Sequence, residues 1–499
     1  MNNKILSNWR INSVMFFSLS VFIMLFASFI NSETVPEKYL QTFDERFYID
    51  NVRLFAYHLK NQDFNKYYNS RLLMPALTCI LMKSLKMDFS IENIRTVFLI
   101  LNFLAIIVAF YYFVKISQYK NFSVQTVSVG IILIFVNFFL FKMTNFYPVL
   151  MDVFGFASGF ALYYYYLKRS KLFYVAIAVS MFIFPTTVMI LGLFLLSRMI
   201  TFSDGGIPLK KYQTFIIAAV LLPVSLFLVY LAFYHMTPEK SAKLTVQIFS
   251  KEMAWLTILL GIFYLVFLLK HIIHVLDGIK INFKTILSSG FVFSAGIAVL
   301  YFLATGYLSA NFKDYTLLTP ETFFLNLSLQ FLSFPFKFLI SHFVYLGLPV
   351  IFLLIFHRRF FGQLKQEDPF LKIVPLLFLF LALGTETRQF LQFLPFVFIP
   401  LLSALQKIRF TNIQLIVFFT FQLLWSRFWF QINTPKGFLS EVPMTGNFFN
   451  ETAQNYFQFH GPWMSISNSV MYGLIFVVVF ALCWLLLRSS VHRKAELSK

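Results

Sequence analysis

Three acidic residues stand next to apolar segments and are the first candidates for chemistry. Asp44 and Glu45 follow shortly after the first apolar segment, and Asp152 opens a later one. A carboxylate at a membrane interface can act as general base toward an acceptor hydroxyl, and an acid at membrane depth usually faces a cavity or a partner. The alternatives are a solvated loop charge for Asp44 and Glu45 and a helix-capping role for Asp152. We predict that these three residues form a catalytic site.

Two arginines at the edges of apolar segments are candidate phosphate ligands. Arg71 opens a short apolar run, and Arg388 opens another apolar segment. A guanidinium presents a planar fork of donors that suits a phosphate group, including the phosphate of a lipid carrier. The alternative is that each arginine extends to the lipid head groups. We predict that Arg71 and Arg388 bind a donor phosphate.

Metal binding and disulfide formation have weaker support in the sequence. His235, His342 and His460 lack the spacing of metal ligands, and Cys79 and Cys483 lie in separate apolar segments. We therefore expect ordinary interface histidines and no disulfide framework. The candidate acids could hold a divalent ion or work without one, so no cofactor is certain and a divalent metal remains open.

Composition places the chain in the membrane. Of its 499 residues 59% are hydrophobic and only 12% are charged, with a formal net charge of +20. The basic residues mostly form short caps between apolar segments, which is typical of cytoplasmic loops and argues against a nucleic-acid partner. No Walker sequence or glycine-rich phosphate loop is present, so a substrate should come from the lipid or from the outer side.

Apolar runs predict an all-α polytopic membrane protein with about 12–14 transmembrane helices. The first run, 13–30, is expected to be an uncleaved anchor. The run 72–87 is short for a span; if it crossed the membrane, the basic runs Lys168-Arg169 and His357-Arg358-Arg359 would face outward, against the positive-inside rule. We therefore place 72–87 along the outer membrane surface and both termini in the cytoplasm.

The predicted organisation is a single polytopic domain over residues 1–499. Its parts are a first span at 13–30, an extracytoplasmic catalytic loop at 31–95 with the juxtamembrane helix 72–87, a transmembrane bundle at 96–430, a late extracytoplasmic loop at 431–468, and a last span with a basic cytoplasmic tail at 469–499.

Four short motifs together resemble the GT-C glycosyltransferases, in particular the branch of the protein O-mannosyltransferases and the lipid A aminoarabinose transferases. Asp44-Glu45-Arg46-Phe47-Tyr48 is similar to the Asp-Glu-x-x-Tyr motif after the first helix of that branch, and Arg71-Leu72-Leu73-Met74-Pro75 to the start of its juxtamembrane helix. Asp152 matches a second acidic position. Arg388 with the following run to Pro400 resembles a late helix near the carrier phosphate.

The resemblance implies a GT-C-like bundle and an inverting glycosyltransferase that uses a polyprenyl-phosphate-linked sugar donor. Asp44 would be the base, Asp152 the supporting acid, and Arg71 and Arg388 would neutralise the departing phosphate. The acceptor would be a lipid, glycan or protein on the extracytoplasmic face of what we expect to be a bacterial inner membrane. The sequence departs from the pattern in having only Pro75 after Arg71, and we expect no large soluble domain at its end.

Two other functions are compatible with the sequence. An O-antigen polymerase or ligase also has many spans and a large outer loop, and it would rely on residues of the 431–468 loop such as Lys436 and His460. A transporter or flippase would show paired repeats and ionisable groups at mid-bilayer. No clear repeat is present, and the acids gather at one predicted face.

Overall fold

The computed structural model describes residues 8–31, 33–35, 44–235, 251–312, 320–429, 461, 464 and 466–497. These residues are mostly helical. The helices of the first half are α1 (Asn8–Ile30), α2 (Glu45–Arg53), α3 (Phe55–Asn61), η2 (Asn69–Arg71), α4 (Leu73–Ser84), α5 (Ile91–Tyr119), α6 (Val124–Phe135), η3 (Phe139–Met143), α7 (Thr144–Phe146), α8 (Asp152–Leu167), α9 (Leu172–Ser180), α10 (Thr187–Met199), η4 (Leu209–Tyr212), α11 (Gln213–Tyr230) and η5 (Leu231–His235).

The helices of the second half are α13 (Lys251–Leu276), η6 (Phe283–Leu287), α14 (Ser289–Leu308), α15 (Pro320–Leu332), α16 (Lys337–Leu346), α17 (Leu348–Ile355), α18 (His357–Leu364), α19 (Pro369–Leu381), η7 (Thr387–Phe393), α20 (Leu394–Leu405), α21 (Asn412–Trp425) and α23 (Ile466–Leu497). The strands β1 (Ile200–Ile207) and β2 (Ile279–Ile281) pair antiparallel, with Ile200 opposite Ile281. The sequence did not predict this small sheet, because β2 is too short to show an alternating pattern.

In the described part of the chain, seven helices are long and apolar enough to cross a membrane, or up to nine if each of two bent helix pairs is one span. The prediction of an all-α polytopic membrane protein is confirmed. The count is below the predicted 12–14 because several apolar segments form helices of only 10–17 residues. These are Leu73–Ser84, Thr187–Met199, Pro369–Leu381 and Asn412–Trp425.

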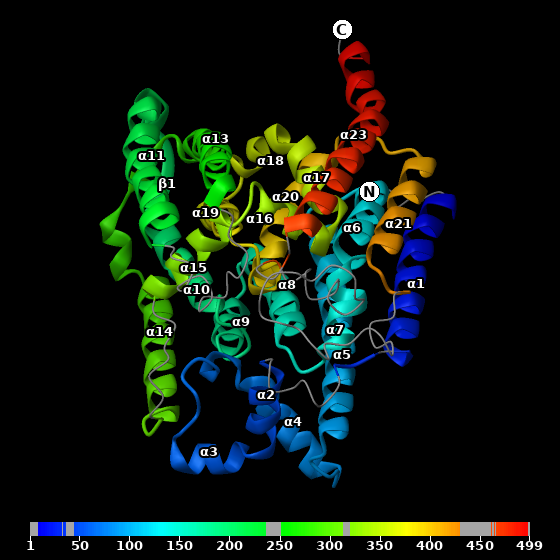
Figure 1. Cartoon of the computed structure of the whole chain (residues 1–499), viewed down its shortest axis with the longest axis vertical. Coiled ribbons are helices and arrows are strands. Elements are labelled where there is room, and N and C mark those ends of the chain that lie inside the picture. Colours follow the sequence, from blue (N-terminus) through cyan, green and yellow to red (C-terminus); the bar gives the residue numbers. More distant parts are fainter. Residues whose placement is uncertain are drawn as a thin grey trace.

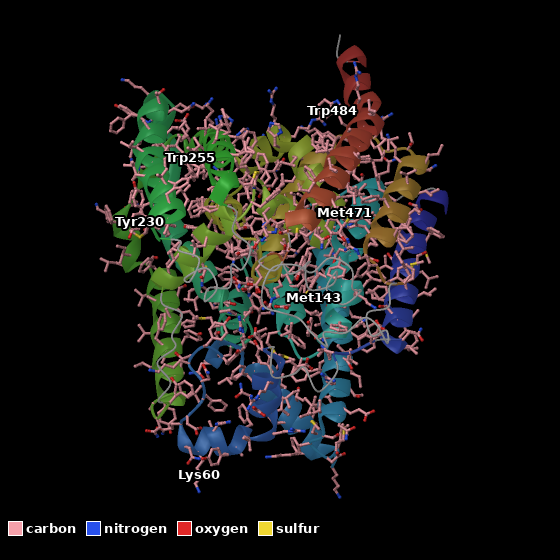
Figure 2. All side chains as sticks on the ribbon, viewed as in Figure 1. Lys60, Met143, Tyr230, Trp255, Met471 and Trp484 are labelled. Atoms are coloured by element: carbon pink, nitrogen blue, oxygen red, sulfur yellow. The ribbon has the colours of Figure 1, made fainter. Side chains whose placement is uncertain are left out.

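The short helices α2, α3 and α4 lie together at one end of the bundle, the lower end in Figure 1. Helix α1 begins and α23 ends at the opposite end. Figure 2 shows Lys60 at the α2–α4 end, Met143 in the interior and Trp484 toward the opposite end. Met143 accepts a hydrogen bond at its sulfur from the hydroxyl of Tyr345, 3.1 Å away. The two ends of the bundle differ, because only one of them carries the layer formed by α2, α3 and α4.

Hydrogen bonds tie the segment that carries α2–α4 to the long helices. The backbone N–H of Phe64 donates to the carbonyl oxygen of Leu308, the last residue of α14. The backbone N–H of Leu73 donates to the carbonyl oxygen of Phe182, which follows α9. The side-chain amide of Asn69 donates to the carbonyl oxygen of Thr305 at 3.0 Å. Because these bonds join the segment to α14 and to the turn after α9, it forms a layer over that end of the bundle.

The segment Thr387–Leu405, which comprises η7 and α20, runs through the centre of the bundle. Of the residues in its most apolar stretch 83% are buried, whereas in Ser289–Leu308, which faces outward, only 11% are. A Cβ atom at Gly159 of α8 would collide with the backbone carbonyl oxygen of Gln392 in η7, so only glycine permits this approach. The Gln392 side chain donates to the hydroxyls of Ser158 and Thr187, at 2.8 and 2.7 Å.

We predict that Gly159→Ala destabilises the protein by about 1–3 kcal/mol, because the added methyl group forces α8 away from η7. Gly192→Ala in α10 is the matched control, since nothing lies within 4 Å of a Cβ at that position. Thermal unfolding in detergent should show a lower midpoint for the first variant only. Equal midpoints for the two variants would contradict the proposed constraint.

Candidate active site

Asp44 connects the α2–α4 layer to the central segment. It stands at the N-cap of α2, but its side chain makes no capping hydrogen bond there. Its Oδ1 instead accepts a hydrogen bond from the hydroxyl of Tyr68 at 3.0 Å, and its Oδ2 lies 3.4 Å from Nη2 of Arg388. The side chain is 30% exposed. Asp44 is therefore held by two partners and still reaches solvent.

Arg388 occupies the start of η7 and contacts two acids. Its Nε donates to Oε1 of Glu386 at 2.7 Å, in addition to the contact with Asp44. The preceding residue, Thr387, shares a 2.8 Å hydrogen bond with Nδ1 of the buried His342, whose Nε2 lies 2.7 Å from the carbonyl oxygen of Ala382. His342 thus helps to position η7.

Arg71 lies against the aromatic residues of the same layer. Its Nη1 donates to the hydroxyl of Tyr48 at 3.0 Å, and its guanidinium carbon lies 4.8 Å from the centre of the Tyr67 ring. Burial acts to lower the pKa of Arg71, but Tyr48, Tyr67 and Asp44 raise it above its usual value. Arg71 therefore remains a cation.

Asp152 is the first residue of α8 and is buried, with 9% of its surface exposed. It lies in the electrostatic field of Arg388 and Arg71, with Glu386 and Asp44 also in range. The structure thus gathers Asp44, Asp152, Arg71 and Arg388, which are far apart in the sequence. Glu386 completes the group; the sequence analysis did not select it, although its position two residues before Arg388 was a usable signal.

Glu45 binds a different partner from Asp44. Its Oε1 accepts a 2.8 Å hydrogen bond from Nε of Arg95, and both side chains are buried, with 0% and 8% exposed. Burial raises the pKa of Glu45 to about 7, against the opposing charge and hydrogen bond of Arg95. This geometry is that of an ion pair that fastens α2 to α5. A catalytic role for Glu45 stays a prediction.

Aromatic rings line the layer beside Asp44. The rings of Phe47 and Tyr68 stack with centroids 4.7 Å apart, and Tyr48 meets Tyr68 edge to face at 5.4 Å. Burial raises the pKa of Tyr68 well above its usual value, and the neighbouring Asp44 raises it further. Tyr68 therefore stays protonated and donates its hydrogen bond to the Asp44 carboxylate.

Three further candidates from the sequence are His235, Lys436 and His460. His235 ends η5, and Lys436 and His460 of the predicted late loop lie outside the described residues. Among the residues that the structure describes, no group of three or more His, Cys, Asp or Glu side chains could hold a metal ion.

Comparison with known proteins adds no relative: no family model, no curated protein and no solved structure matches this chain. What the fold itself defines is a multi-pass helical membrane protein, by the length and apolarity of its helices. Beyond that class, the charged group at the α2–α4 end is the basis for an assignment of function.

We predict that the burial of Glu45 makes the free energy of unfolding depend on pH. A carboxyl whose pKa is raised from 4.5 to about 7 on folding contributes stability that is fully present below pH 4.5 and is lost as the pH rises through about 7. The midpoint temperature of unfolding in detergent should therefore decrease as the pH rises from 5 to 8. The decrease should be smaller in Glu45→Gln.

The control for this measurement is Glu92→Gln, which changes an exposed glutamate in the first turn of α5. This variant should keep the pH dependence of the wild type. The interpretation is wrong if Glu45→Gln and Glu92→Gln show the same dependence.

Proposed function

We propose that the protein is an inverting glycosyltransferase of the membrane that moves a sugar from a polyprenyl-phosphate donor to a lipid, glycan or protein acceptor. The observation that carries this proposal is the contact between Asp44 and Arg388, 3.4 Å apart, with Arg71 and Asp152 in electrostatic range. In the transfer of a sugar from a phosphate donor, a base can accept the proton of the acceptor, and two guanidinium groups can stabilise the charge of the departing phosphate. The resemblance of the motifs to GT-C enzymes agrees with this assignment.

The two arginines are suited to bind the donor phosphate. Charge-assisted N–H···O bonds are typically about 2.7–2.9 Å long, so the 3.4 Å contact between Arg388 and Asp44 is a weak one. A phosphate oxygen could therefore replace the Asp44 carboxylate as a partner of Arg388. Arg71, whose guanidinium contacts the Tyr48 hydroxyl and the Tyr67 ring, would supply the second cation.

In the proposed reaction, the acceptor oxygen bonds to the anomeric carbon of the sugar while the bond from that carbon to the phosphate oxygen breaks. The electron pair of the broken bond stays on the polyprenyl phosphate, where Arg71 and Arg388 stabilise its charge. The proton of the acceptor passes to Asp44. Attack on the face opposite to the phosphate inverts the configuration of the sugar.

The α2–α4 end would be extracytoplasmic. The positive-inside rule places the short basic loops and both termini in the cytoplasm. Helix α1 begins and α23 ends at the end of the bundle opposite to α2–α4, which supports this orientation (Figure 1). A donor in the outer leaflet of a bacterial inner membrane would then reach Arg71 and Arg388 from the lipid.

We expect Asp44→Asn to reduce sugar transfer by at least about 100-fold, because the amide cannot accept the acceptor proton. The assay follows consumption of radiolabelled polyprenyl-phosphate sugars by the purified protein in proteoliposomes. Asp50→Asn is the control, since Asp50 lies in the same helix, is 45% exposed and pairs only loosely with Arg46 at 3.8 Å. Transfer near the wild-type rate by Asp44→Asn would exclude Asp44 as the base.

We expect Arg388→Lys to lower kcat/KM for the donor about tenfold or more. Lysine keeps the charge but loses the planar fork, and one lost hydrogen bond to a charged group is worth about 1.5–3 kcal/mol. The exposed Arg46 of the same layer provides the control Arg46→Lys. An unchanged kcat/KM in Arg388→Lys would argue against phosphate binding at this position.

A further inference from the structure

The connection between α19 and η7, residues 382–386, leads directly into Arg388. It starts with Ala382, whose backbone N–H donates to the carbonyl oxygen of Phe378 at 2.7 Å and so closes the last turn of α19. It ends with Glu386, whose Oε1 accepts the hydrogen bond from Nε of Arg388. The position of the Arg388 guanidinium therefore depends on the side chains that fix this connection.

Gln330 of α15 fixes the middle of the connection. Its Oε1 accepts a hydrogen bond from the backbone N–H of Thr385 at 2.9 Å and another from the Thr385 hydroxyl at 3.1 Å. Both residues are buried, and Thr385 has no exposed surface. A buried N–H that loses its acceptor costs more free energy than an exposed one, which can turn to water. Gln330 therefore holds Thr385 in place.

His342 of α16 joins the two ends of the connection. Its Nε2 lies 2.7 Å from the carbonyl oxygen of Ala382, and its Nδ1 lies 2.8 Å from the hydroxyl oxygen of Thr387. Because a carbonyl oxygen can only accept, Nε2 carries the proton, and Nδ1 of the neutral ring accepts from the Thr387 hydroxyl. The imidazole thus links the end of α19 to the residue directly before Arg388.

Gln330 and His342 reach the same connection because the chain bends between them. The helical segments Phe324–Leu332 and Lys337–Leu346 are bent by 95° relative to each other. In a straight α-helix, residues as far apart in sequence as these two would be separated by about 18 Å along the axis. Their threonine partners are two residues apart and so lie within about 7 Å of each other. The bend is what allows both side chains to bind there.

We propose that the bent pair α15–α16 positions Arg388 for the donor phosphate, with Gln330 and His342 as the positioning residues. Their hydrogen bonds hold the connection in the shape that directs the guanidinium toward Asp44, where the phosphate would bind. Buried and fully bonded polar groups of this kind make a site rigid. The inference rests on the proposed function, since it assigns to these residues an effect on the binding of a polyprenyl phosphate.

The test measures, by native mass spectrometry of the full chain in detergent, the preference for undecaprenyl phosphate over undecaprenol. The two lipids differ only at the phosphate, so the ratio of their dissociation constants reports contacts of that group. Thr387→Val removes the hydroxyl that His342 binds and should reduce the preference about tenfold, because a displaced guanidinium loses a charged hydrogen bond to the phosphate. Gln330→Met, which removes the acceptor for Thr385, should act in the same direction.

Two control variants should keep the wild-type preference. Thr387→Ser retains the hydroxyl at the same position. Thr257→Val removes a hydroxyl that is buried to a similar degree, since Thr257 is 2% and Thr387 is 1% exposed, but that donates within α13 to the carbonyl oxygen of Met253 at 2.9 Å. An equal loss in Thr257→Val would show a general effect of removing a buried hydroxyl and would overturn the proposal.

A purely stabilising role of Gln330 and His342 gives a different result. It would lower the midpoint temperature of unfolding of Thr387→Val and Gln330→Met and leave their lipid preference unchanged. That outcome, in a wild type that prefers the phosphate, would overturn the positioning role alone. A wild type that binds both lipids equally would instead argue against a polyprenyl-phosphate site, and would overturn the proposed function together with this inference.

Discussion

The close packing of η7 on α8 is the constraint on which the rest of the site depends. Gly159 allows the two backbones to meet, and the buried Gln392 bonds to hydroxyls on α8 and α10. Because Arg388 is the second residue of η7 and Asp152 is the first of α8, this packing sets the distance between a cation and an acid at the same end of the bundle. A residue with a side chain at Gly159 would separate them.

Two kinds of ion pair serve different purposes in this fold. The Glu45–Arg95 pair is 2.8 Å long and almost fully buried, so it holds helices together and is expensive to break. The Asp44–Arg388 contact is 3.4 Å long and its side chains are 30% and 22% exposed. A weak, accessible contact can be exchanged for a substrate group, whereas a short, buried one cannot be exchanged at low cost.

The membrane shapes the distribution of these charges. Outer helices such as α14 expose apolar side chains, while the central segment Thr387–Leu405 is buried and carries its one charged residue, Arg388, at its start. Charges in hydrocarbon are costly, so Arg388, Asp152 and the α2–α4 layer meet at the end of the spans. A substrate that is itself part lipid and part sugar phosphate would be divided in the same way between the hydrocarbon and the interface.

The sequence by itself determined the class of protein, because long apolar runs permit only helices in a bilayer. It also located the apolar helix near 72–87, observed as Leu73–Ser84, and selected the charged residues worth following. Hydropathy could not distinguish a full span from a short apolar helix, since it measures polarity and not helix length. Only the tertiary structure decided that Asp44 meets Arg388, that its neighbour Glu45 turns to Arg95, and that Gln330 meets Thr385. These contacts join residues 50 to 344 positions apart, and such pairs are set by helix packing, which local sequence patterns do not encode.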